Sequence, residues 1–251
     1  MRDPRPPVCT GGTKIAQQGL ALWVPCRAYY VRFNADARGS EGLGDFHRRI
    51  STSSPEAQSY TAMVRFGMWD EIRARTEPDA DRLEGCDLYA KATALAAKSR
   101  VDEAKSELPK LEKLAASDGN GDFERVKAVL AVAVLNAKAR ITVAEGNKPA
   151  AIGLSREAVE KEDRLAYSEP ADWFFPARHL LGSVLIEADQ AADAEAVYRD
   201  DLSRNPNNGW ALYGLTQSLR MQGHNADAQR VQQQFDRALR NADVTLAASA
   251  F

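Results

Sequence analysis

The sequence is poor in the residues that most often build metal and disulfide sites, with three cysteines and three histidines among 251 residues. The cysteines are widely spaced and odd in number, and no CxxC pair is present, so neither a disulfide framework nor a zinc site is expected. The histidines lie far apart and lack the HExxH spacing of a metalloprotease. We therefore expect no metal ion and no cofactor. This use of cysteine predicts a reducing, cytoplasmic compartment.

Motifs of catalytic chemistry are missing as well. No GxSxG sequence is present, and the glycines of residues 10–14 lack the spacing of a phosphate-binding loop. The paired carboxylates at Asp102 and Glu103 fit a solvated helix face with local ion pairs. The sequence therefore predicts no catalytic residue.

Neither sign of charge dominates, because 33 Lys and Arg residues face 35 Asp and Glu residues. A nucleic-acid binder usually carries a strong basic excess, and a membrane-surface protein a polybasic cluster. The longest apolar run, residues 128–135, is far shorter than the roughly 20 residues that cross a bilayer. We expect a soluble protein without a nucleic-acid or membrane partner.

Two parts of the chain differ in composition. Residues 1–57 are punctuated by proline and glycine and predict an irregular N-terminal segment. Residues 58–251 show helical periodicity without the alternation of β-strands, and the expected helices are all separated by turn residues. Their ranges are 57–74, 83–98, 101 onward, 124–145, 149–163, 171–188, 191–204, 208–222 and 225–240.

A pattern with a period of about 34 residues occupies residues 175–241, and this length is typical of helix–turn–helix tetratricopeptide repeats. The two copies carry the positions Leu181, Gly182, Ala194, Tyr198, Leu202, Pro206 and then Leu215, Gly223, Ala228, Phe235.

The same pattern extends toward the N-terminus with longer insertions. A small residue recurs where paired helices would cross, at Ala104, Ala151, Ala194 and Ala228. Turn-compatible residues stand five positions earlier, at Ser99, Gly146, Asp189 and Gly223. Small alanines allow close helix approach. The sequence thus predicts an all-α, right-handed α-solenoid of antiparallel helix pairs with about four repeats.

Four segments resemble the C-terminal part of bacterial tetratricopeptide-repeat (TPR) proteins: residues 64–72, 169–176, 205–223 and 242–251. The resemblance covers roughly residues 60–251 and implies an α-solenoid that acts through protein or peptide contacts. Larger relatives carry further repeats before the segment with Phe66, Gly67 and Trp69. Here residues 1–57 take that place, so the first helices lack a polar cap. We expect residues 1–57, a second copy of the chain or a partner to cover this end.

The resemblance also implies a binding groove, because the first helix of each tetratricopeptide pair lines the concave face. The predicted groove residues are Tyr89, Thr93, Asn136, Arg140, His179, Ser183, Glu187, Trp210, Tyr213, Gln217 and Arg220. This mixture of aromatic, amide and basic groups suits an extended peptide or an acidic tail. The alternative is an ordinary solvated surface.

Two hypotheses for function follow. The first is a non-enzymatic scaffold or adaptor that binds a protein or peptide segment on the concave face. The second is an accessory subunit of an enzyme, or an enzyme whose chemistry is supplied by a partner or by residues 1–57. An open groove favours the first, and a deep pocket with converging titratable groups favours the second.

Overall fold

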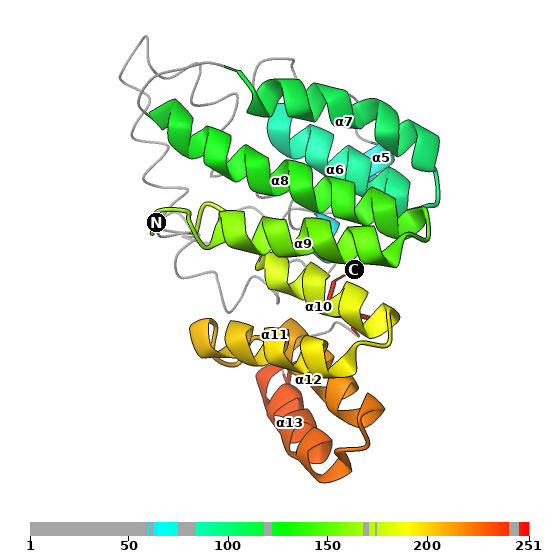
Figure 1. Ribbon diagram of the computed structural model, residues 1–251, viewed down its shortest axis with the longest axis vertical. Coiled ribbons are helices and arrows are strands. Elements are labelled where there is room, and N and C mark those ends of the chain that lie inside the picture. Colours follow the sequence, from blue (N-terminus) through cyan, green and yellow to red (C-terminus); the bar gives the residue numbers. More distant parts are fainter. Residues whose placement is uncertain are drawn as a thin grey trace, which may run out of the picture.

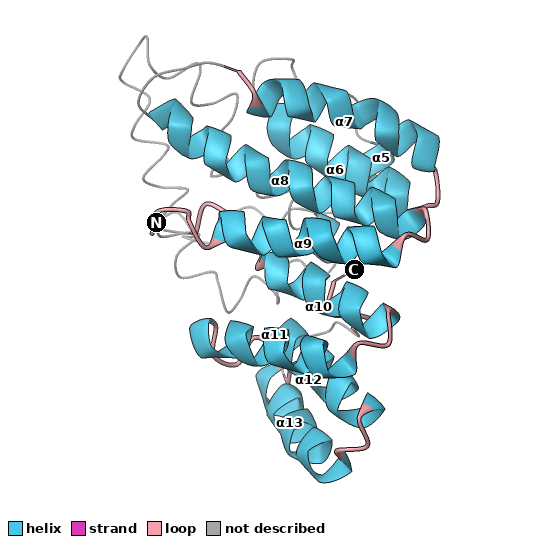
Figure 2. Cartoon of the chain, viewed as in Figure 1, coloured by secondary structure: helices cyan, strands magenta, loops and turns pink. Residues whose placement is uncertain are grey.

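Every regular element in the described part of the chain is an α-helix (Figures 1 and 2). The computed structural model describes residues 60, 63–74, 84–117, 122–167, 171–173, 175–240 and 246–250. The all-α prediction is confirmed for these residues. The expectation of an irregular segment over residues 1–57 lies outside them.

After the helical residues 63–65, nine further α-helices follow one another along the described chain. They are α5 (Trp69–Ala74), α6 (Glu84–Ala97), α7 (Val101–Ala115), α8 (Asp122–Ala144), α9 (Lys148–Glu162), α10 (Ala177–Glu187), α11 (Ala191–Arg204), α12 (Gly209–Met221) and α13 (Asn225–Ala238).

The helices form two layers. From α5 to α13 each helix packs against its successor, while α8 also contacts α6 and α10, and α10 also contacts α12. The even-numbered helices therefore form one layer and α7, α9, α11 and α13 lie outside it. Figure 1 shows this order along the long axis, with α5–α7 at one end and α13 at the other.

The helix pairs are joined by the same tight turn, which we call the left-handed turn. One residue has positive φ, and its N–H donates a hydrogen bond to the carbonyl oxygen of the residue three positions earlier. The N–H of the following residue donates to the carbonyl oxygen five positions before it. The positive-φ residues in the four pairs are Ser99 (59°), Gly146 (80°), Asp189 (59°) and Gly223 (75°). These are the four turn positions that the sequence predicts.

The four aligned alanines occupy matching places in the outer helices. Ala104, Ala151 and Ala194 are completely buried, and Ala228 is 2% exposed. A residue without a side chain beyond Cβ lets the outer helix approach its inner neighbour closely, so each alanine permits close contact within its pair.

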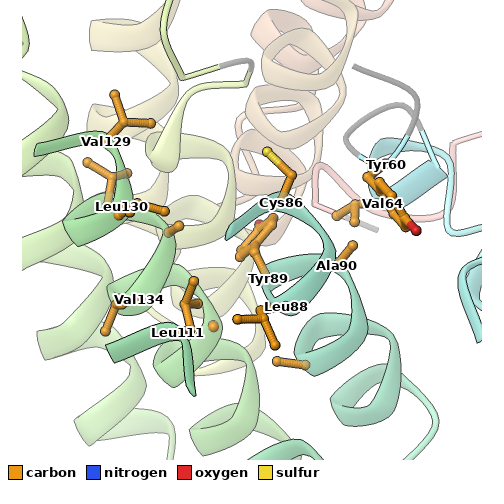
Figure 3. Packing of buried hydrophobic residues seen from close by; sticks show 14 of the residues in the cluster. Tyr60, Val64, Cys86, Leu88, Tyr89, Ala90, Leu111, Val129, Leu130 and Val134 are labelled. Atoms are coloured by element: carbon orange, nitrogen blue, oxygen red, sulfur yellow. The ribbon is translucent and has the colours of Figure 1, made fainter. Parts of the chain in front are cut away.

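The core is divided along the stack. One large cluster surrounds α6 and α8, and Figure 3 shows Tyr60 and Val64 on one side of α6, with Leu111 and Leu130 on the other. A second large cluster surrounds α10–α13 and includes Tyr198. Burial of such apolar side chains contributes roughly 25 cal/mol per Å² and is the main stabilising term.

Two expected helices start or continue differently. The helix expected over residues 171–188 begins only at Ala177, with Pro176 as its N-cap residue. Proline disfavours helical backbone in the residue before it, so the helix starts after Pro176 instead of passing through it. The helix expected over residues 57–74 is broken at Gly67, whose φ of 64° forms another left-handed turn before α5.

Candidate functional site

The chain packs two of its own segments against one surface of α10 and α12. We call this surface the α10/α12 face and define it by His179, Tyr198, Trp210 and Tyr213. Residues 63–68 lie against its Trp210 and His179, and residues 246–250 lie against its two tyrosines. In Figure 1 the short red segment near the label C accordingly lies beside α10.

Tyr198 reaches this face from the outer layer. It belongs to α11, and its ring packs directly on two glycines, Gly182 of α10 and Gly214 of α12. A Cβ atom at Gly182 would lie 2.3 Å from the ring carbon Cζ, and one at Gly214 would lie 2.1 Å from it. The two glycines therefore leave space between α10 and α12 for the Tyr198 ring, which any residue with a Cβ atom would fill.

The tail formed by residues 246–250 is held by hydroxyl groups. The Tyr213 hydroxyl donates to the carbonyl oxygen of Ala247 at 3.0 Å. The Ser249 hydroxyl is hydrogen-bonded to that of Tyr198 and donates to the carbonyl oxygen of His179 at 3.3 Å. Ser249 and Ala250 are each 2% exposed, so this end of the tail is enclosed by the helices, whereas Ala247 is exposed.

His179 is the centre of a buried polar chain. Its Nδ1 lies 2.9 Å from a guanidinium nitrogen of Arg65, and its Nε2 lies 2.9 Å from the carboxylate of Asp201. Arginine only donates, so Nδ1 accepts and the imidazole is neutral with its proton on Nε2. Asn205 donates to the other carboxylate oxygen of Asp201 at 3.0 Å.

Burial agrees with this protonation state. It lowers the pKa of His179 to about 4, and the nearby Arg65 charge acts in the same direction, against the opposing effect of Asp201. The lone pair of Nδ1 is already used by Arg65, so this imidazole has no free acceptor with which to act as a general base. The cluster holds α10, α11 and residues 63–68 together.

Arg65 is enclosed by aromatic rings. Its guanidinium carbon lies 3.9 Å from the ring centroid of Trp210 and 5.4 Å from that of Phe175. Burial lowers its pKa to about 9, which still leaves the group charged at neutral pH. Neighbouring Phe66 adds a tilted ring contact with Trp210 at 6.0 Å. These stacked contacts fasten residues 63–68 to α12.

Most of the predicted groove residues on α6, α8 and α10 are buried. Tyr89, Thr93, Asn136, His179 and Ser183 are between 0% and 6% exposed. Tyr89 packs edge-on against Trp173 at 5.3 Å, and the Asn136 amide donates to the Val132 carbonyl of its own helix at 3.0 Å. In this arrangement none of the five presents a free surface to a partner.

The remaining predicted groove residues are more accessible. Trp210, Tyr213 and Gln217 are partly buried on α12, whereas Glu187 and Arg220 are exposed. Arg220 donates to Gln232 of α13 at 2.9 Å. Arg140 is partly buried, and burial lowers its pKa while Tyr89 and Glu187 oppose that shift. The structure thus brings His179, Trp210 and Tyr213 of the predicted set into contact with Arg65 or the tail.

Several residues at this site fall outside the set predicted from the sequence, among them Arg65, Tyr198, Asp201 and Ser249. Asp201 stands seven residues after the buried Ala194, where the pattern expects an apolar side chain. A carboxylate at such a position needs a buried partner, and this was the available signal for the contact with His179. The small, apolar composition of residues 246–250 was a comparable signal for burial of the tail.

A second charged cluster joins α9, α10 and α11. The buried Arg178 donates to both carboxylate oxygens of Asp163 at 2.8 and 2.7 Å and to Asp200 at 2.5 Å. Arg204 adds a bond to Asp163 at 3.1 Å. Since these charged groups pair with one another, the cluster has a structural role and links the three helices.

Within the described ranges, no group of three His, Cys, Asp or Glu side chains is placed to hold a metal ion. Among the described helices, none combines the length and apolar composition that crossing a bilayer requires. Comparison of the chain with models of known protein families, with curated proteins and with solved structures finds no match.

Proposed function

We propose that this chain is a TPR-like α-solenoid that works as a non-enzymatic scaffold or adaptor and binds a peptide segment on the α10/α12 face. Two features support the solenoid: the two-layer order of the helices and the repetition of one turn and one buried alanine through four helix pairs. Repeat proteins of this class commonly use such surfaces for extended ligands.

The contact between the tail and the two tyrosines carries the proposal. Residues 246–250 form no helix, yet Ser249 and Ala250 are buried against α10, α11 and α12. One of the hydrogen bonds uses a main-chain carbonyl of the tail, a group that any peptide offers. A surface that holds one extended segment in this way has the chemistry to hold another.

Selection of peptides from a random display library on the full chain tests this function. We expect enriched peptides to protect backbone amides of α10 and α12 from hydrogen exchange. Tyr213→Glu should weaken their binding at least about tenfold, because it removes the hydroxyl donor and places a carboxylate beside the peptide carbonyl.

The matched control is Gln233→Glu, which makes the same addition of negative charge at an exposed position of α13. It should leave peptide affinity unchanged. Thermal unfolding of both variants checks that the helices remain folded. The proposal is wrong if no peptide is enriched, or if the enriched peptides protect only helices other than α10 and α12.

A further inference from the structure

The tail has the properties of a bound ligand. It returns from the end of α13 to contact α10, 70 residues earlier in the chain at the Ser249–His179 bond. Its polar contacts reach two tyrosine hydroxyls and a helix carbonyl, all of them part of the helical stack. The groups that hold the tail thus all belong to the helices.

The buried end of the tail requires small side chains. Ala250 is 2% exposed and belongs to the same apolar cluster as Leu181 and Leu215. Ser249 is equally buried and its hydroxyl has partners on both sides, Tyr198 and the His179 carbonyl. A long side chain at either position would have to displace close-packed neighbours, while an alanine or serine fits without rearrangement.

We propose that residues 246–250 are the resident ligand of the α10/α12 face, and that this face takes external peptides with serine or alanine at the two successive positions of Ser249 and Ala250. This inference rests on the proposed function and names its ligand class and its regulation. An external peptide binds only by replacing the tail.

Mass action allows such a resident ligand to compete effectively with external peptides. A segment tethered by a short linker is present at an effective concentration on the order of millimolar. If the tail binds with an intrinsic dissociation constant of about 100 µM, it occupies the face in roughly nine molecules out of ten. The apparent affinity of an external peptide then falls about tenfold, until the tail is weakened or withdrawn.

The test measures binding of a labelled peptide with the sequence of residues 241–251 to three forms of the full chain. Ser249→Ala weakens only the resident tail, because the added peptide keeps its serine. The variant removes two hydrogen bonds of Ser249, one of them long at 3.3 Å. One neutral hydrogen bond is worth about fivefold in an equilibrium constant, so this variant should bind the peptide about fourfold to eightfold more tightly than the wild type.

Tyr213→Phe is the matched control. It removes one oxygen atom from the receptor and therefore weakens the tail and the added peptide equally, so apparent affinity should stay within about twofold of the wild type. Tyr213→Glu differs, because its carboxylate weakens binding far beyond the roughly tenfold that release of the tail can offset. A third variant, Ala250→Arg, places a long charged side chain at a buried position and should expel the tail, with a gain of about tenfold. If that variant does not fold, the comparison of Ser249→Ala with Tyr213→Phe still decides the result.

The resident-ligand inference is overturned if Ser249→Ala binds the peptide no better than the wild type, or if Tyr213→Phe gains as much as Ser249→Ala. It is also overturned if the peptide binds none of the folded variants. Library-selected peptides that still bind in that case leave the proposed function standing, whereas failure of both kinds of peptide removes both proposals.

Discussion

The imidazole of His179 on α10 donates from Nε2 to the carboxylate of Asp201 on α11 at 2.9 Å, and the two side chains are 1% and 0% exposed. Arg65 donates to the opposite ring nitrogen at 2.9 Å, so both nitrogens are occupied. If Nδ1 were protonated, its hydrogen would face the N–H group of Arg65, and two donors would oppose each other. This pair ties the inner and outer helix layers together and makes their association sensitive to acid.

The first prediction concerns that sensitivity. Burial lowers the pKa of His179 to about 4, below its ordinary value of 6.5, so the unfolded chain binds the proton more tightly. The free energy of unfolding should therefore fall as pH drops from 6.5 toward 4, with a contribution of about 2–3 kcal/mol from this residue. Urea unfolding at several pH values measures it.

Two glutamine variants assign the effect. His179→Gln should be less stable than the wild type at pH 7 but should lose less stability between pH 6.5 and 4. His224→Gln alters an exposed histidine and should follow the wild-type profile. Equal profiles for the wild type and His179→Gln would show that His179 is not held neutral.

Glu162 predicts a pH effect of opposite sign. Burial raises its pKa to about 7, although it accepts a hydrogen bond from the Ala177 amide at 2.8 Å. The folded chain then binds the proton more tightly than the unfolded one, so stability should decline by about 1–3 kcal/mol as pH rises from 4.5 through 7. Glu162→Gln keeps an acceptor for Ala177 and should remove this decline. Glu160→Gln, at an exposed position of the same helix, should retain it.

The left-handed turns predict stability changes of opposite sign at equivalent positions. Ser99 and Asp189 adopt φ of 59°, which costs a residue with a Cβ atom about 1–2 kcal/mol relative to glycine. Ser99→Gly and Asp189→Gly should each raise the free energy of unfolding by about 0.5–1 kcal/mol. Gly146→Ala and Gly223→Ala should lower it by about 1 kcal/mol, and no atom within 4 Å of the new Cβ adds a steric contribution. Thermal or urea unfolding that gives the same sign for all four would contradict this account.

The close packing of the Tyr198 ring on two glycines predicts that larger residues at the glycine positions destabilise the fold. Gly182→Ala and Gly214→Ala place a methyl group on the tyrosine ring and should each cost about 1–3 kcal/mol. Gly153→Ala in α9 meets nothing within 4 Å and should stabilise the helix by up to about 1 kcal/mol. Combining Gly214→Ala with Tyr198→Leu should recover part of the loss. A simple sum of the two single costs would show that the glycine and the ring do not interact.

Local features were predictable from the sequence because they depend on few neighbours. The turn at Asp189 and the burial of Ala194 follow from spacing and residue size alone, and both are found. The start of α10 was not predicted correctly, because the expected helix was extended across Pro176 and the proline determined where the helix begins.

The candidate site was harder to predict because it is built by contacts between distant residues. Arg65 and His179 are 114 residues apart, and no periodicity connects them. The pattern placed His179 and Tyr213 on the inner helices but gave no means of knowing that residues 63–68 and 246–250 would lie over them. The solvent accessibility of a helix face depends on every segment that packs on it. It could therefore not be derived from the position of a residue in the repeat.

The passage of Tyr198 between Gly182 and Gly214 has an evolutionary consequence. A phenol that crosses one helix layer to meet the tail makes four positions interdependent: two glycines, one tyrosine and one serine. Where a related sequence carries a larger residue at position 182 or 214, it should carry a smaller one at position 198, and Ser249 would then lose its phenolic partner. Such coupled substitutions in an alignment of related sequences would reveal the contact between the tail and the helices.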